Sequence, residues 1–321
     1  MNRSNISNTY APFLGRIYIP LALAAACCAG GIARAGIDII ESDDDDTQEL
    51  RQTIVGVHER GDVQRGARVT GQARTVGMVY HGGPVMTGTV NVYVIWYGNW
   101  AGNTATTIIP AFLGSLGGSP YWNINTTYYN GSNVHLSNSL TFAGQATVGY
   151  PYGTALSDAA IQSVVGGVIG SGALPKDTNG IYFVLTSADV TASSGFCTQY
   201  CGWHAHGTIG GSDIKYSFVG NPDRCITSCS AQSVGPNGNA GADGMISIIA
   251  HEAEEAATDP DLNAWYDRQG AENADKCAWT FGTMSTAANG AKYNMTLAGQ
   301  NYLVQRNWKN VGSGSCVMTY P

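Results

Sequence analysis

The stretch ISIIAHEAEEAATDP, residues 246–260, constrains the fold more than any other part of this chain. Its apolar residues recur at helical spacing, and one histidine and three glutamates are embedded among them. An unpaired buried charge is expensive, so these four groups must face water, pair with one another or hold a metal ion. Asp243 is placed to cap this helix and Pro260 to end it, because the residue before a proline is pushed out of the α region.

The order of the ionisable residues in this helix indicates metal chemistry. At about 100° per residue, His251 and Glu255 fall on one face, one turn apart, and Glu252 stands beside them. H-E-x-x-H metalloproteases use this arrangement, with the intervening glutamate as general base; here the second histidine is a glutamate. Zinc accepts carboxylate oxygen as well as imidazole, so we predict His251 and Glu255 as zinc ligands and Glu252 as the catalytic base. A solvated helix face with local ion pairs is the alternative.

Two other segments can complete such a site. In AENADKC, residues 271–277, we expect Glu272 as the third ligand and Asp275 as the group that orients His251. In CGWHAHG, His204 is the alternative third ligand, although it can equally stack on Trp203 or bond a carbonyl. Calcium is the alternative cation, because most of these ligands are oxygens.

The N-terminus and the cysteines predict export. Residues 1–35 have the basic start, apolar run and ARA cleavage site of a signal peptide, and residues 36–75 form a charge-rich, flexible leader. An even number of cysteines in an exported chain is typical of disulfides, here three with open pairing, and a zinc–thiolate site is the weaker alternative. The cysteines that remain after the signal is removed are Cys197, Cys201, Cys225, Cys229, Cys277 and Cys316.

The composition excludes several classes of function. A net charge of -7 and a pI of about 5.2 do not fit a nucleic-acid-binding protein, which needs a basic surface. No membrane-surface patch is present once the signal is removed. The chain has no G-x-S-x-G elbow, Walker loop or dinucleotide fingerprint. The oligomeric state is left open.

Residues 76–321 read as one domain in which strands and helices alternate. We expect core strands at 88–100, 180–190 and 214–221, hairpins at 121–144, and helices at 106–117 and 157–172. Pro110 is expected in the first turn of its helix, where it is tolerated. The aromatic residues of 95–100 and 121–129 are expected in the core. The predicted fold class is α/β (α+β): a single zincin-like domain with a mixed β-sheet, an active-site helix and disulfide-stapled loops.

With these motifs in view, the chain resembles the EXORDIUM-like, or phosphate-induced, family of secreted proteins. The resemblance rests on YHGGPVMTGTVNVYVIWYGNW, GIYFVLTSADVTASSGFCTQYCGWHAHG, KYSFVGNPDRC, GPNGNAGADGMISIIAHEAEEAATDPDLNAWYD and AGQNYLVQRNW. It implies export, since plant members are cell-wall or apoplastic proteins, and the family's Cys-Gly-x-His element maps onto Cys201, Gly202 and His204. It does not imply a defined reaction.

The motif and the resemblance together predict a secreted zinc-dependent hydrolase, a peptidase acting on a peptide or other extracellular substrate. A periplasmic or cell-wall location fits the same evidence. The alternative is a non-catalytic extracellular protein that binds cell-wall glycans or a signalling partner through its aromatic loops.

Overall fold

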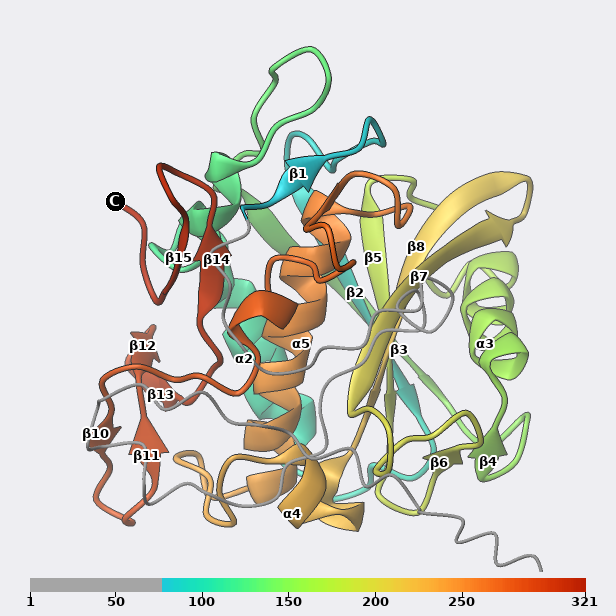
Figure 1. Cartoon of the computed structure of the whole chain (residues 1–321). Coiled ribbons are helices and arrows are strands. Elements are labelled where there is room, and N and C mark those ends of the chain that lie inside the picture. The colour runs from blue at the N-terminus through green and yellow to red at the C-terminus, as the bar shows by residue number, and fades with distance from the viewer. Residues whose placement is uncertain (1–76) are drawn as a thin grey trace, which may run out of the picture. The chain divides into compact units, whose positions relative to one another are not determined.

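A mixed five-stranded sheet is the centre of the protein (Figure 1). The computed structural model describes residues 77–321, so the predicted signal peptide and leader lie outside the described residues. The first four strands in spatial order are parallel, and the last runs antiparallel to its neighbour. In that order the strands are β3 (Leu140–Val148), β2 (Val90–Tyr97), β5 (Gly180–Thr186), β8 (Ser212–Gly220) and β7 (Gly202–Ile209). The α/β class with a mixed sheet is confirmed.

The inner strands follow from their sequences. All residues of β5 are buried, and β2 is buried except at Asn91. Parallel strands covered on both faces need such near-continuous apolar runs of valine, isoleucine and tyrosine. β3 lies at the edge of the sheet and alternates between more and less exposed residues. The sequence therefore distinguishes the centre of the sheet from its edge.

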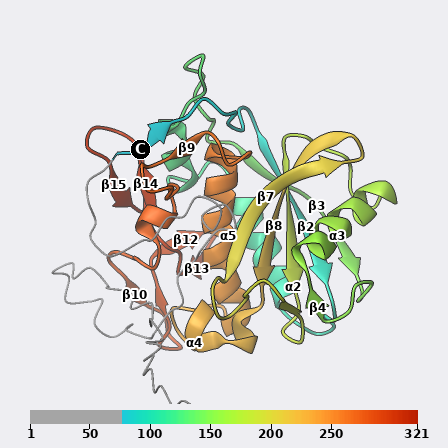
Figure 2. The ribbon, with the colours of Figure 1, turned by 45° about the vertical axis from the view of Figure 1, so that its right-hand side comes forward.

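Two crossover helices cover opposite faces of the sheet. α2 (Ala105–Leu116) connects β2 to β3, and α3 (Asp158–Gly170) returns the chain from β3 to β5 on the other side of β2. Right-handed crossovers in opposite directions along a sheet place their helices on opposite faces. Figures 1 and 2 show α3 on one side of the sheet and α2 with α5 on the other. Ser157 caps α3, accepting a hydrogen bond from the Ala160 backbone N–H.

The long helix α5 (Ala240–Thr258) carries the H-E-x-x-E motif and is buried almost throughout. It packs against β7, β8 and α2. Its N-cap is Asn239, whose side chain accepts a hydrogen bond from Ala242; Asp243, predicted as the cap, lies in the first turn and instead binds Asn237. The helix begins earlier than predicted because Ala240 to Gly244 are small enough to pack closely on the loop after β8. A Cβ on Gly241 would lie 2.4 Å from the Asn221 side chain.

Two further local predictions were wrong. Pro110 lies in the middle of α2, not in its first turn. The helix persists because Ile109, Phe112 and Leu113 are fully buried, and their packing outweighs the roughly 3 kcal/mol cost of an internal proline. The segment 121–144 is not a set of hairpins. It forms the 3₁₀ helix η2 (Trp122–Thr127), an isolated bridge between Tyr129 and His135, and β3, which pairs parallel to β2.

Short elements and disulfides complete the structure. The three predicted disulfides are present: Cys197–Cys225, Cys201–Cys229 and Cys277–Cys316. No helix in the described part of the chain has the length and apolar character needed to cross a membrane. The remaining elements are β1 (Val79–Tyr80), β4 (Ala155–Leu156), β6 (Thr191–Ala192), η3 (Pro222–Arg224), α4 (Ile226–Cys229), β9 (Trp265–Tyr266), η4 (Asp275–Cys277), β10 (Ser285–Thr286), β11 (Lys292–Tyr293), β12 (Met295–Leu297), β13 (Gln300–Tyr302), β14 (Asn307–Lys309) and β15 (Ser315–Val317).

Candidate metal centre

The motif residues of α5 are all buried. His251 is 1 % exposed, and Glu252, Glu254 and Glu255 are fully buried. The alternative of a solvated helix face is therefore excluded. Glu254 lies apart from the other two acids, next to Tyr121 and Asn307.

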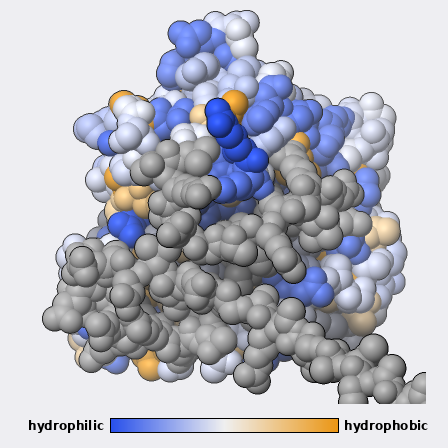
Figure 3. All heavy atoms as spheres, in the orientation of Figure 1, coloured by the Kyte–Doolittle hydropathy of each residue, from blue (hydrophilic) through white to orange (hydrophobic). Residues whose placement is uncertain are grey.

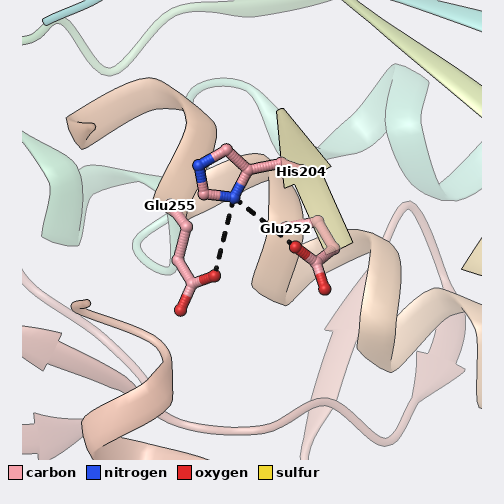
Figure 4. A group of neighbouring side chains, drawn as sticks. All are labelled: His204, Glu252 and Glu255. Carbon is pink, nitrogen blue, oxygen red and sulfur yellow. Dashed lines mark ion pairs between the residues drawn. The ribbon is translucent and has the colours of Figure 1, made fainter. Parts of the chain in front are cut away.

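His204 comes to the motif from β7, the antiparallel edge strand that packs against α5. Its Nδ1 lies 3.6 Å from Oε2 of Glu252 and 3.8 Å from Oε2 of Glu255 (Figure 4). Its Nε2 lies 3.4 Å from the backbone carbonyl of Asp259, to which it can donate. A histidine that donates from Nε2 presents the Nδ1 lone pair to the two carboxylates, and this is repulsive unless a proton or a cation lies between them.

Close packing of β7 on α5 depends on Gly202. A Cβ at this position would lie 2.5 Å from Cγ2 of Ile248 and 3.1 Å from Oε1 of Glu252. Any side chain here would push the strand away from the motif helix. The disulfide Cys201–Cys229 fixes the residue before Gly202 to α4, which itself packs on α5. The Cys-Gly-x-His element thus positions His204.

A second group of donors forms around His251. Its Nε2 lies 3.0 Å from Oε1 of Glu255 and 3.5 Å from Oδ1 of Asp275. The Asp275 backbone N–H donates to the same Glu255 oxygen at 2.9 Å. Asp275, predicted to orient His251, is therefore adjacent to it, but at the ring nitrogen that also faces Glu255. Cys277–Cys316 fixes this segment to β15.

Glu272, predicted as the third ligand, faces His204. Its Oε1 lies 3.9 Å from Nε2 of His204, on the other ring nitrogen from Glu252 and Glu255. Among the described residues around the motif, two groups have donor atoms that all lie within 4.8 Å of one another: His204–Glu252–Glu255 and His251–Glu255–Asp275. Glu272 belongs to neither group. The sequence could identify all these residues as candidates, but it could not show that Glu255 belongs to both groups.

Burial and neighbouring charges perturb the pKa values of these groups. Burial raises the pKa of Glu252 to about 7, although His204 and His251 oppose this increase. Burial, with a further contribution from Glu255, raises the pKa of Asp275. Burial alone would lower the pKa of His251, but Glu255 and Asp275 raise it well above its usual value. Without a cation, the cluster must hold protons instead.

The donor set fits a small divalent metal ion. Two imidazoles together with carboxylates are typical of zinc, whereas calcium sites consist of oxygens alone. Neither oxygen of Glu252 and neither ring nitrogen of His251 makes a hydrogen bond of normal geometry within the described residues. Buried polar groups are rarely left in this state, and metal binding at the cluster would satisfy them.

The cluster is closed to solvent for the most part. Among its described residues, His204, Glu252 and Glu255 are inaccessible, Glu272 is 2 % exposed, and the side chain of Asp275 is 9 % exposed. Asp275 is therefore the residue of the cluster that lies nearest to solvent.

A third histidine–aspartate group lies further along β7. His206 is 2.9 Å from Asp213 and 3.7 Å from Asp261, and the Lys215 ammonium contacts both aspartates at 2.6 Å and 2.9 Å. The lysine already supplies the positive charge, so this group is an ion-pair network and not a metal site.

Comparison with known proteins gives the family. The model of the phosphate-induced protein 1 conserved region matches residues 78–318. The chain belongs to this family. It is 31 % identical over 283 residues to Protein EXORDIUM-like 3 of Arabidopsis thaliana. The aligned region covers 76 % of this chain and 83 % of that relative. It is 30 % identical over 218 residues to Protein PHOSPHATE-INDUCED 1 of Nicotiana tabacum, covering 58 % of this chain and 66 % of the relative.

The family resemblance predicted from the motifs is therefore confirmed. The names of these relatives state no reaction. No solved structure matches the chain. The disulfides fit an extracellular protein of the phosphate-induced protein 1 family, because such bonds persist in oxidising compartments.

Proposed function

We propose that this member of the phosphate-induced protein 1 family is a secreted, zinc-dependent hydrolase that cleaves peptide bonds. The observation that carries the proposal is the burial of His251, Glu252 and Glu255 against His204 and Asp275, at distances suited to a shared cation. Calcium is the alternative ion, which the two imidazoles disfavour.

In this proposal, His251 and Glu255 hold the ion. Glu272 remains the third ligand predicted from the sequence, with His204 as its alternative, and Asp275 lies 3.5 Å from Nε2 of His251. A bound zinc ion acidifies water and polarises a carbonyl. Glu252 is the group that takes a proton, because it lies beside the ligands and its pKa of about 7 suits a general base at neutral pH.

The closed site favours a second candidate, a non-catalytic extracellular protein. Structural zinc sites are closed, whereas catalytic sites keep a position open for water. Here, among the described residues of the centre, Asp275 is the most exposed, and its side chain is only 9 % exposed. An ion at this centre would then hold α5, β7 and the Asp275 segment together. The glycan or signalling partner of such a protein would bind at another surface.

Glycan binding through the aromatic loops is less well supported. Trp100, Tyr121, Trp122 and Tyr128 are buried in the core, as expected from the sequence. Where the described part of the chain is visible in Figure 3, its strongly hydrophobic residues are scattered. Tyr150 and Tyr152 are the exposed tyrosines of the described region.

Metal analysis combined with peptide cleavage tests the proposal. The secreted protein should retain zinc through dialysis, cleave members of a quenched-fluorescent peptide library, and lose cleavage on treatment with a chelator. His251→Ala should lose both zinc and activity. Glu252→Gln should lose activity, by about 10² to 10⁴ for loss of a general base, while zinc remains at His251 and Glu255.

Glu254→Gln is the matched control. Burial raises the pKa of Glu254 well above its usual value, which favours the neutral carboxyl, and glutamine closely resembles that form. This variant should keep zinc and activity. Zinc without cleavage of any peptide favours the non-catalytic candidate, and a protein that binds no metal contradicts both readings of the centre.

A further inference from the structure

The carboxylate of Glu255 faces two separate groups of donors with its two oxygens. Oε2 faces Nδ1 of His204 at 3.8 Å, on the side where Glu252 also lies. Oε1 faces Nε2 of His251 at 3.0 Å, on the side where Asp275 lies. A carboxylate that presents one oxygen to each of two donor groups has the geometry of a bridging ligand.

The distances within each group match the coordination sphere of a small cation. Two ligand atoms bound to zinc at about 2.0–2.2 Å in a tetrahedral arrangement are about 3.3–3.6 Å apart. In the first group, the distances from His204 to Glu252 and Glu255 are 3.6 Å and 3.8 Å. In the second, the distances from His251 to Glu255 and Asp275 are 3.0 Å and 3.5 Å. The donor atoms of each group all lie within 4.8 Å of one another, so each group can close on one ion.

Each group also contains a buried side chain whose hydrogen-bonding capacity is not used. In the first group this is Glu252, which is fully buried and accepts no hydrogen bond of normal geometry from the described residues. In the second it is His251, which is 1 % exposed and makes none through either nitrogen, although Glu255 is 3.0 Å away. One ion bound in one group would satisfy the side chain of that group, but the side chain in the other group would still lack a partner for its hydrogen-bonding atoms.

The charge of the cluster also points to two ions. Glu252, Glu255, Glu272 and Asp275 carry four negative charges when ionised. With neutral imidazoles, one divalent cation offsets two of these charges, and two divalent cations offset all four.

We infer that this centre binds two divalent cations bridged by Glu255, one held by His204 and Glu252 and the other by His251 and Asp275. The inference rests on the proposed function, because it assumes that the cluster binds metal. It gives His204 a ligand role on a second ion. It also revises one part of the single-ion mechanism, because Glu252 becomes a metal ligand in place of its role there as the base. Two-metal sites of this kind hold their ions about 3.5–4 Å apart and suit hydrolytic substrates with two oxygens to polarise.

The experiment counts ions in the full-length secreted protein. The protein is stripped with a chelator, reloaded with Zn²⁺, dialysed and measured by elemental analysis; Mn²⁺-loaded protein is then examined by electron paramagnetic resonance. We expect two zinc ions per chain and the spectrum of a magnetically coupled Mn²⁺ pair. Glu252→Gln and Asp275→Asn should each lower the count from two to one and remove the coupling. Glu254→Gln should keep both ions.

The outcomes separate this inference from the proposed function. One zinc ion per chain, with the same count in Glu252→Gln, overturns the two-ion centre and leaves the single-ion hydrolase intact. A chain that binds no ion overturns both. Glu→Gln and Asp→Asn preserve the shape of the side chain, and circular dichroism of each variant confirms that a lower ion count reflects a lost ligand and not a lost fold. If one of these variants misfolds, His204→Ala takes its place. His206→Ala is then the control, because His206 is an exposed histidine on the same strand.

Discussion

Removing the metal should make the stability of this protein strongly dependent on pH, and Glu252 should account for a defined part of that dependence. In the folded, metal-free protein, burial raises the pKa of Glu252 from 4.5 to about 7. The folded state then keeps a proton that the unfolded state releases. Between about pH 4.5 and 7 the folded state binds more protons, so the free energy of unfolding must fall as the pH rises.

The pKa difference sets the magnitude of this effect. At about 1.4 kcal/mol per pH unit, a change from 4.5 to about 7 corresponds to roughly 3 kcal/mol. The raised pKa values of His204 and His251 act in the same direction at higher pH, because the stability from a protonated histidine is lost as the pH rises through its folded-state pKa.

Urea unfolding in EDTA at pH 4.5 and pH 8 measures this dependence. Glu252→Gln should reduce the loss of stability between these pH values by about 3 kcal/mol, because glutamine does not titrate. Metal-loaded wild-type protein should show a much smaller loss, since a cation replaces the protons. If the glutamine variant and the wild type lose equal stability in EDTA, Glu252 is not buried as described and the reasoning fails.

Three further predictions test how the fold supports the centre. In Gly202→Ala, the new Cβ would lie 2.5 Å from Ile248 of α5, so the variant should lower the free energy of unfolding by about 1–3 kcal/mol and weaken zinc binding in a chelator competition. Gly167→Ala is the control, because its Cβ would have no heavy atom within 4 Å; it should change neither quantity. The double change Cys277→Ser and Cys316→Ser should cost about 2–4 kcal/mol in urea unfolding and also weaken zinc binding, because it releases the segment beside the centre; unchanged zinc affinity would show that the disulfide does not position it. Phe112→Ala, at a fully buried position in α2, should cost about 3–5 kcal/mol by calorimetry without changing the ion count, and a loss below 1 kcal/mol would contradict the packing described.

Part of the fold was predictable because local patterns agree with it. The apolar runs of β2 and β5 and the Ser157 cap of α3 depend on neighbouring residues alone. Predictions failed where distant contacts decide the outcome. Pro110 is tolerated inside α2 through burial of that helix, and β3 pairs with β2 across a crossover that no turn signal indicates.

The sequence by itself determined the chemistry available to this protein: the H-E-x-x-E spacing places His251 and Glu255 one helical turn apart, and Cys201, Gly202 and His204 follow one another on the chain. Helical periodicity is a local property, so these relations hold before any tertiary contact forms. Only the tertiary structure brought His204 to Glu252, placed Asp275 at His251 and turned Glu272 toward His204. Those positions depend on how β7 and the segment after α5 pack against the motif helix, and packing between distant segments is fixed by the whole core together with its disulfides.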